Sequence, residues 1–596
     1  MTNDICKHFL KTVDTYPNEV SVVYKNTTWL KETWLNYQQK VAFFSQFLLQ
    51  QKVKAKDTIA ILSETRYNWA ICDLSILSIG CVTTPIYASN TPEDIEYILN
   101  NSEAKVLIID TLENYHKWEQ VKDRVKAVKT VICFNHIENV GEDNIFVWED
   151  ALKSGYSDDV VSKLRSNIEK IKIDDLATIV YTSGTTGKPK GVMLTHQQIM
   201  SEVTDIFALA NINQKDSSLS FLPMAHIMGR IEIWGHVYAG FKMGYAENIE
   251  TLRSNFLTIK PTFIVSVPRI FEKIYNGVIS QAEASPLRTK LFKWAVSIGK
   301  EVSEKTHKNE SLPLDLLAKY KIAKKLVFDK LIEKMGGNIR YAIAGGAPLS
   351  QEIAEFFHAS GLLVLEGYGL TETTGGVSFN APYAYKFGTV GKPIGDVEIS
   401  FKEDGEILVR SKKVMAGYFK RPEDTSSVLQ DGWLHTGDIG TLTHDGFLKI
   451  TDRKKDLIKT SGGKYVAPQK IENLLKLNKF ISNVLVHGDQ KKYIVCLITL
   501  NIENIKQELL KKGVSFTNPA GLSTHTEVLR IIREAISDVN QQLASFETIK
   551  NFAILNSDFT IENGELTPSL KVRRKFCDEK YKDTINALYG VDASTF

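Results

Sequence analysis

Cysteine is scarce in this chain of 596 residues. No cysteine stands in a C-x-x-C pair or beside a histidine at metal-ligand spacing, so we expect packed thiols of the core rather than metal ligands. Such sparse use of cysteine is typical of a reducing cytosol, and it predicts a cytoplasmic protein. The six cysteines are Cys6, Cys72, Cys81, Cys133, Cys496 and Cys577.

An excess of one charge sign is also missing. The chain has 73 Lys and Arg residues against 70 Asp and Glu residues. A nearly balanced charge provides no whole-chain field for nucleic acid or for an anionic membrane. The composition therefore predicts no nucleic-acid partner.

Long apolar runs and a secretion signal are lacking as well. The first seven residues contain no basic segment followed by an apolar one, so secretion is not expected. The best membrane-span candidate, Ile71 to Ala88, contains Asp73, Gly80 and Pro85, which favours a buried helix that turns into a strand. No integral membrane segment is predicted. Peripheral contact with the inner face of a membrane stays open, as does the choice between monomer and homodimer.

What is present is the composition of a large globular protein, with 43% apolar and 10% aromatic residues. A chain of this length is expected to form several domains. Up to about Val390, apolar strand-like runs alternate with helix-spaced segments, which predicts α/β sheets with covering helices. The clearest are a helix over 34–50, a helix through 69–77, and strands over 58–62, 106–109, 131–134, 263–267 and 341–344.

After Val390 the pattern changes to short strands separated by turns, which predicts a β-rich subdomain over 397–401, 405–409 and 446–450. A charged segment, 452–459, then meets a Gly-rich one, 460–463, and this composition is typical of a linker. Beyond it, strands over 484–486 and 493–500 and an amphipathic helix from Glu527 predict a small α+β unit. That helix repeats Val528, Ile532, Ala535, Val539 and Leu543 on one face.

We therefore expect an α/β protein with two domains: 1–453, made of α/β sheets and a β-rich subdomain, and 454–596, a small mobile α+β domain.

A Gly/Ser/Thr loop follows the apolar run 177–180, and from Tyr181 to Gly191 it reads Y-T-S-G-T-T-G-K-P-K-G. Small residues let backbone amides approach an anion, and hydroxyl and lysine side chains add donors and charge, which is the chemistry that a polyphosphate needs. The loop is two residues too short for a Walker loop, and Pro189 stands where a Ser or Thr should hold magnesium. A plain polar surface turn is the alternative. The predicted phosphate-binding residues are Thr182, Ser183, Gly184, Thr185, Thr186, Gly187, Lys188 and Lys190.

This ordered loop closely resembles the phosphate loop of the AMP-forming acyl-adenylate superfamily, which includes acyl-CoA ligases, luciferases and peptide-synthetase adenylation domains. The resemblance spans nearly the whole chain, from about Asp57 to Arg574, and further segments that resemble the superfamily follow the loop in order. They are L-P-M-A-H-I at 222–227, G-G-A-P-L at 345–349, G-Y-G-L-T-E at 367–372, T-G-D at 436–438, Arg453, and the stretch 565–574 around Lys571. Singly, each segment has an ordinary explanation as a turn or a solvated charge, but together, in this order, they are specific to the superfamily.

The resemblance implies a site for ATP. Tyr368 would stack on adenine, Asp438 and Arg453 would bind the ribose hydroxyls, and Glu372 and Thr182 would hold Mg²⁺. The remaining nucleotide-binding residues that the resemblance implies are Gly345, Gly346, Ala347 and Pro348, along the adenine edge, and Gly369 and Thr371 beside Tyr368.

The resemblance also implies the catalytic groups. Lys571 would bridge the acid carboxylate and the α-phosphate, a task that suits a flexible point charge. His226 would orient the carboxylate and gate the acyl site. Lys455 would be the hinge about which the C-terminal domain rotates, bringing Gly462 beside the pantetheine path of coenzyme A, where a residue without a side chain permits close approach. Without the resemblance, Lys571 reads as a solvated charge, His226 as structural and Gly462 as a turn residue.

Within the superfamily, the segments 222–230 and 266–273 and a long helical insert from 501 to about 545 most resemble bacterial long-chain fatty acid–CoA ligases. Amino-acid-activating relatives carry an Asp in the first of these motifs, and none lies between Leu222 and Ile227, which disfavours an amino-acid substrate. We expect an ATP-dependent long-chain fatty acid–CoA ligase that binds fatty acid, ATP, coenzyme A and Mg²⁺. The alternatives are an acyl-acyl carrier protein synthetase and a catalytically silent lipid- or nucleotide-binding protein.

Overall fold

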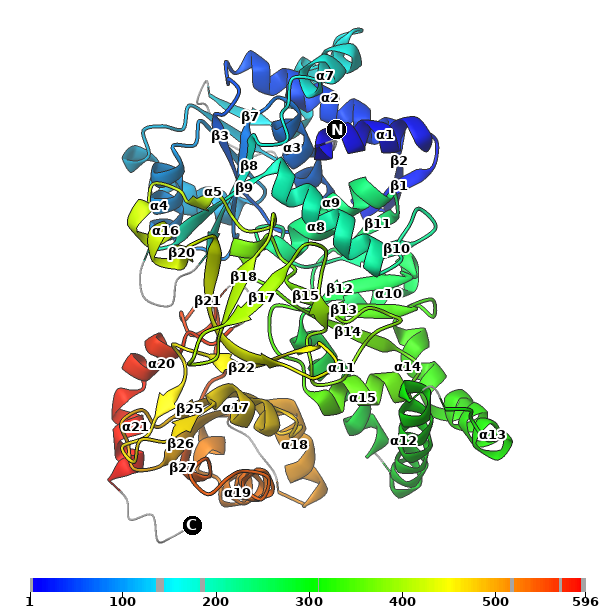
Figure 1. The fold of residues 1–596 in the computed structure, drawn as a ribbon, viewed down its shortest axis with the longest axis vertical. Coiled ribbons are helices and arrows are strands. Elements are labelled where there is room, and N and C mark those ends of the chain that lie inside the picture. The colour runs from blue at the N-terminus through cyan, green and yellow to red at the C-terminus, as the bar shows by residue number, and fades with distance from the viewer. Residues whose placement is uncertain are drawn as a thin grey trace.

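A computed structural model describes most of the chain (Figure 1). Residues Ser183 to Gly187 of the predicted phosphate loop lie outside the described part. The described residues are 4–135, 144–182, 188–283, 285–308, 310–514, 519–567 and 571–590.

The first large element is an eight-stranded sheet in the order β19-β9-β8-β4-β3-β5-β6-β7, with β3 to β7 parallel to their neighbours. Side chains of successive strand residues point to opposite faces. In β3, Ile59 and Ile61 pack with α2 and α3, whereas Leu62 packs with α4 and α5 on the other face. The strands are β3 (Thr58–Leu62), β4 (Val82–Ile86), β5 (Val106–Ile109), β6 (Thr130–Cys133), β7 (Ile145–Val147), β8 (Leu176–Thr182), β9 (Lys190–Thr195) and β19 (Gly417–Tyr418). The covering helices are α2 (Trp34–Gln50), α3 (Tyr67–Ser78), α4 (Pro92–Ser102) and α5 (Leu112–Glu119).

A second sheet has the order β12-β13-β14-β15-β16, and a third has the order β10-β11-β1-β2. The strands β12, β13 and β14 are parallel, so their carboxyl ends meet at one edge. The strands of the second sheet are β12 (Phe263–Ser266), β13 (Tyr341–Ala344), β14 (Leu363–Tyr368), β15 (Ser378–Phe379) and β16 (Lys392–Pro393). Those of the third sheet are β10 (Ser217–Ser220), β11 (Lys242–Tyr245), β1 (Val20–Lys25) and β2 (Trp29–Thr33). Other helices of this part are α1 (Ile5–Thr15), α6 (Trp148–Ser154), α7 (Val160–Ile168), α8 (His196–Leu209), α9 (Ile227–Ala239), α10 (Leu252–Ile259), α11 (Pro268–Ala282), α12 (Pro286–His307), α13 (Leu314–Ala323), α14 (Asp329–Lys334) and α15 (Gln351–Ala359).

The predicted β-rich region is an antiparallel sheet of β17 (Glu398–Phe401), β18 (Glu406–Arg410), β21 (Trp433–Leu442), β20 (Leu429–Gln430) and β22 (Leu448–Arg453). The last strand runs through Arg453, three residues beyond the predicted end at Ile450, because it stays paired with the long strand β21. The short helix α16 (Pro422–Val428) precedes β20.

The C-terminal unit has its own core, built on β25 (Ile481–His487), β26 (Ile494–Leu500) and β27 (Ile549–Ile554). The predicted helix is confirmed as α19 (Thr526–Asn540), with Val528 and Ile532 buried. Leu543 lies beyond its end, so its place in the helical stripe was wrong, although it packs against the same core. The other elements are the hairpin β23 (Ile458–Lys459) and β24 (Tyr465–Val466), and the helices α17 (Pro468–Lys476), α18 (Ile502–Lys511), α20 (Arg574–Lys580) and α21 (Lys582–Tyr589).

These elements confirm the α/β fold class with a larger N-terminal part and a smaller α+β C-terminal part; the mobility of the latter and the boundary at 453/454 stay predictions. The segment 71–88 forms the buried end of α3 and then β4, as expected. All six cysteines are buried and unpaired. Among the described helices, none has the length and apolarity to cross a membrane.

Candidate active site

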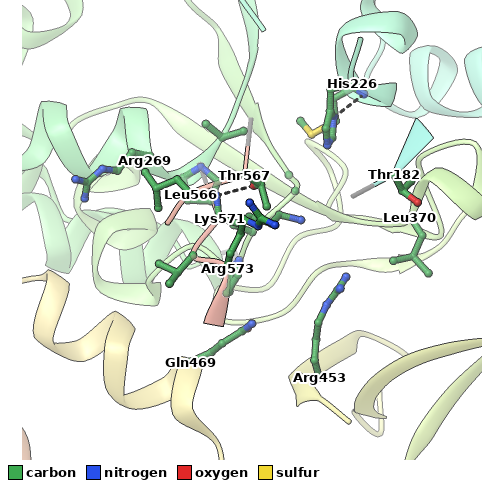
Figure 2. A pocket seen from close by; sticks show the side chains of 18 of the residues that line it. Thr182, His226, Arg269, Leu370, Arg453, Gln469, Leu566, Thr567, Lys571 and Arg573 are labelled. Carbon is green, nitrogen blue, oxygen red and sulfur yellow. Dashed lines mark hydrogen bonds between the residues drawn. The ribbon is translucent and has the colours of Figure 1, made fainter. Parts of the chain in front are cut away.

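A cavity of about 3230 Å³ lies between the N-terminal sheets and the C-terminal unit, and Figure 2 shows it from close by. Its N-terminal wall includes the ends of β8, β13 and β14 and the β21–β22 pair. Its C-terminal wall includes α17, α18 and the segment around Lys571. The predicted residues that line it are Thr182, Lys190, His226, Gly345, Gly346, Ala347, Pro348, Tyr368, Gly369, Thr371, Glu372, Asp438, Arg453, Lys455 and Lys571.

The antiparallel register of β21 and β22 sets Asp438 directly opposite Arg453. Arg453 Nε lies 3.1 Å from Asp438 Oδ1, and the Tyr368 hydroxyl donates to Asp438 Oδ2 at 2.7 Å. Burial and the Asp438 charge hold the pKa of Tyr368 well above its usual value, so the hydroxyl stays a donor. These three residues therefore form one polar group. Some of their mutual contacts could be replaced by hydrogen bonds to sugar hydroxyls.

The carboxylate of Glu372 lies in the short helix η3 (Thr371–Thr373), directly after β14. Its Oε1 accepts a hydrogen bond from the Tyr418 hydroxyl at 2.8 Å. Thr182 ends β8, and its hydroxyl donates to the Lys190 carbonyl at a long 3.4 Å. Mg²⁺ prefers oxygen ligands and is usually held by one or two carboxylates together with water and substrate phosphates. One carboxylate and one hydroxyl on the same cavity fit that requirement.

The lysines of the phosphate loop are held by other residues. Lys190 Nζ lies 2.5 Å from Asp424 Oδ1 and 5.1 Å from the centre of the Tyr418 ring. Lys188 Nζ lies 5.2 Å from the centre of the Tyr97 ring and is not among the described residues that line the cavity. Lys190 would thus have to leave Asp424 to meet a phosphate. Asp424 could not be predicted as a partner of Lys190, because it is distant in the chain and belongs to no motif.

Glycine is required at two predicted positions. Gly346 has a φ of +80°, in the left-handed region that favours glycine. A Cβ on Gly369 would lie 1.2 Å from the Gly375 carbonyl oxygen, so the chain passes too closely there for any side chain. Bare backbone therefore lines the cavity at both places.

His226 is the N-cap of α9, and its Nδ1 accepts a hydrogen bond from the Met228 amide at 3.2 Å. Burial, with a smaller effect of the Lys571 charge, lowers the pKa of His226 to about 4. The ring is therefore neutral at pH 7. Since Nδ1 accepts, the ring hydrogen belongs on Nε2, where it can donate to an anion.

Lys571 belongs to the C-terminal unit, and its backbone amide donates to Thr567 Oγ1 at 3.1 Å. In the view of Figure 2 its side chain lies near the centre, with His226, Thr182 and Arg453 to its right. Desolvation by the surrounding protein and the Arg453 charge lower the pKa of Lys571 to about 8, although the charges of Asp438 and Glu372 act to raise it. The C-terminal unit thus directs one cation at the polar group of the N-terminal wall.

Gly462 does not lie with the predicted residues that line the cavity. It lies on the exposed turn between β23 and β24, and it is not among the described residues that line the cavity. A Cβ there would meet only Thr460 Oγ1, at 4.0 Å. Lys455 is exposed and follows the end of β22 by two residues, where the chain passes to the C-terminal unit.

Sequence reasoning missed the contacts that join the two walls. Arg269, at the start of α11, donates from Nη1 to the Ser482 carbonyl at 2.9 Å and from Nη2 to Ser482 Oγ at 3.1 Å. Ser280 on the same helix bonds Asn504 of α18 at 3.3 Å. Arg269 lies in a segment that carries the resemblance, but nothing in the sequence pointed to its partner.

A family model described as AMP-binding enzyme matches residues 9–419, and one described as AMP-binding enzyme C-terminal domain matches residues 455–593. The chain belongs to the AMP-binding enzyme family. Among curated members, the long-chain-fatty-acid–CoA ligase FadD15 of Mycobacterium bovis is 36% identical over 546 residues, which cover 91% of this chain and 90% of the relative. Long-chain-fatty-acid–CoA ligase 6 of Homo sapiens is 32% identical over 603 residues, covering 94% and 83%.

Solved structures share the fold of this AMP-binding enzyme. The adenylation domain of a carboxylate reductase from Mycobacterium chelonae has a TM-score of 0.78 at 20% identity, covering 99% of this chain and 91% of that one. The anthranilate CoA ligase AuaEII, in complex with anthranoyl-AMP, has a TM-score of 0.75 at 16% identity, covering 98% of each chain. The predicted acyl-adenylate-forming fold is confirmed.

Proposed function

We propose that this chain is an ATP-dependent long-chain fatty acid–CoA ligase, which converts acid, ATP and coenzyme A to acyl-CoA, AMP and pyrophosphate. The observation that carries the proposal is that Lys571 of the C-terminal unit lines one cavity together with Asp438, Glu372 and His226 of the N-terminal part. The curated relatives that carry this activity in their names support the choice of substrate.

In the first step, an acid carboxylate oxygen attacks the α-phosphorus of ATP, and pyrophosphate leaves. His226 Nε2–H donates to the carboxylate and orients it, while Asp438 and Arg453 hold the ribose. Protonated Lys571 stabilises the negative charge that develops between carboxylate and α-phosphate, an electrostatic role that is typically among the largest in catalysis. A Mg²⁺ held by Glu372 and Thr182 would neutralise phosphate charge and orient the leaving pyrophosphate.

In the second step, the thiolate of coenzyme A attacks the carbonyl of the mixed anhydride, and AMP leaves with the bonding electron pair. We propose that the C-terminal domain, 454–596, rotates about Lys455 between the steps. Rotation would withdraw Lys571 and bring Gly462 to the thiol path. Support comes from the exposed position of Gly462, which contributes nothing to the cavity in the present arrangement.

The acyl chain would lie in the apolar part of the cavity, beyond His226. Each buried methylene contributes about 0.8 kcal/mol of transfer free energy, so a long chain gains far more than acetate does. The apolar residues that line the cavity on this side include Ile206, Phe207, Phe221, Met228, Ile231 and Val265.

A substrate panel with ATP tests the function. AMP release should be fast with palmitate-like acids and coenzyme A, and slow with acetate, benzoate or amino acids. Faster turnover of acetate or an amino acid than of every long acid would contradict the proposal. Slow reaction with coenzyme A but rapid transfer to acyl carrier protein would favour an acyl-acyl carrier protein synthetase. No AMP or pyrophosphate release with any acid would favour the silent binding protein.

A further inference from the structure

The helices α12 and α13 and the π-helix η2 (Lys324–Phe328) form a projection at the edge of the molecule (Figure 1). Its inner side is a small core of Ala295, Ala323 and Phe328. None of the described residues between 286 and 334 lines the cavity. The projection therefore has a packing role on one side and no role in the chemistry proposed above.

The outer side of α13 and η2 is also apolar. Leu314, Ala318, Ile322 and Leu326 recur every fourth residue, so they follow one face of the helix. Leu314 is 86% exposed, Ile322 53% and Leu326 43%. A continuous exposed apolar stripe of this kind marks an interaction surface rather than a scattering of single residues. We call these four residues the outer stripe.

Basic residues lie along one side of the outer stripe. The segment 286–334 has 12 Lys and Arg residues against 6 Asp and Glu residues, although the whole chain has a net charge of only +3. On α13 and η2, Lys321 and Lys325 are one turn apart and flank the stripe on one side. Both are exposed, and neither forms an ion pair with a described residue, whereas Lys319 is paired with Asp315 at 3.0 Å.

We propose that the outer stripe, with Lys321 and Lys325, docks on the surface of a lipid bilayer that contains anionic headgroups. An apolar helix face flanked by lysines is the pattern of helices that lie in the membrane interface. The apolar side chains would enter the boundary of the acyl region, while the lysine ammonium groups meet the headgroups. Charge complementarity selects this partner, because the local excess of positive charge stands out in an otherwise balanced chain.

The docked orientation would also suit a substrate that resides in membranes. The helix α11 packs against α12 on one side and lines the cavity on the other, through Asn276, Gly277 and Ser280. A surface on α13 therefore brings a wall of the cavity near the bilayer. Vesicle binding itself does not depend on turnover, so it can fail or succeed independently of the ligase proposal.

Flotation of the full-length protein with vesicles tests the proposal. Binding is expected to vesicles of phosphatidylcholine mixed with phosphatidylglycerol, to be weaker with phosphatidylcholine alone, and to weaken at high salt. Ile322→Glu/Leu326→Glu and Lys321→Glu/Lys325→Glu should each reduce the affinity for the mixed vesicles by about ten-fold or more.

Matched controls lie elsewhere on the surface. Leu112→Glu/Leu510→Glu changes two other exposed leucines, and Lys105→Glu/Lys129→Glu two other exposed lysines. Both control variants should bind as wild type does, and all four should adenylate a fatty acid supplied in solution at the wild-type rate. If the stripe variant does not fold, the lysine variant and the salt dependence decide.

Three results would overturn the proposal. They are failure of the wild type to float with mixed vesicles, unchanged binding by both surface variants, and a wild-type homodimer that dissociates on substitution of the stripe while vesicle binding is absent. The last result would assign the stripe to a second copy of the chain.

Discussion

The two walls of the cavity differ in how their functional residues are held. On the N-terminal wall, Tyr368 and Arg453 both contact Asp438, and strand register sets Asp438 opposite Arg453. On the C-terminal wall, Lys571 reaches the site only because the whole unit is docked, partly through Arg269 and Ser482. Gly462 belongs to the same C-terminal unit but does not line the cavity. A fixed wall and a docked wall can serve two reactions in turn, because undocking exchanges one set of residues without disturbing the other.

Removal of the Lys571 ammonium group should have the largest effect on the difference between the two walls. Lys571→Ala should slow acyl-adenylate formation by about 100-fold or more, because one preorganised charge is lost where negative charge develops. Thioester formation from supplied acyl adenylate should stay near wild type. Pyrophosphate exchange and single-turnover acyl-CoA formation measure the two steps. Lys582→Ala, at an exposed position, is the control; equal losses in both steps would contradict the assignment.

Gly462→Leu should show the opposite pattern. A side chain there meets open space in the present arrangement, so folding and adenylation should be unaffected. Thioester formation from supplied adenylate should fall by about ten-fold to 100-fold, since a leucine would obstruct the thiol path. Ser461→Leu places the same side chain one residue away as a control. Wild-type thioester rates for Gly462→Leu would remove this residue from the site.

Glu372→Gln tests the fixed wall. The amide keeps the shape and can still accept from the Tyr418 hydroxyl, but it loses the full negative charge toward Mg²⁺. Adenylation should fall about ten-fold at limiting Mg²⁺ and recover in part at high Mg²⁺. The measurement is a Mg²⁺ titration of pyrophosphate exchange, with Tyr418→Phe as a control for the lost hydrogen bond. An unchanged titration would refute the ligand role.

The pH dependence of adenylation tests the role of Lys571. Its pKa is lowered to about 8, so the ammonium form predominates below that pH and is lost above it. The kcat/KM for adenylation should therefore decline as pH rises through about 8, approaching a ten-fold loss per pH unit at higher pH. Lys571→Arg stays protonated throughout and should lack this decline, even if its rate is lower. The same decline in Lys571→Arg would assign it to another group.

Arg269→Ala should give the smallest effect. It removes two hydrogen bonds between the walls without touching the chemistry, so docking should weaken and adenylation should slow by about five-fold. Thioester formation from supplied adenylate should be unchanged or faster. Arg253→Ala, at an exposed position outside the cavity, is the matched control. Slower thioester formation with normal adenylation would contradict a docking role.

Much of the fold could be predicted because local patterns agree with it. The apolar strand 58–62 and the helix 34–50 were predicted with the bounds that the structure has, since strand and helix periodicities are local properties. The end of β22 could not be predicted, because pairing with β21 carries the strand through polar residues to Arg453. Leu543 shows the opposite error: its spacing continues the pattern of α19, but the helix ends before it.

The family, the order of the motifs and the identity of most residues around the cavity could be predicted from the sequence, because short motifs in a fixed order are local patterns. Which of these residues meet depends on the three-dimensional fold. It set Tyr368 against Asp438, held Lys190 on Asp424, made His226 a neutral N-cap, and separated Gly462 from Lys571. Most of these contacts, with the burial and the pKa values that follow from them, depend on residues that are distant in the chain, and no local pattern specifies those.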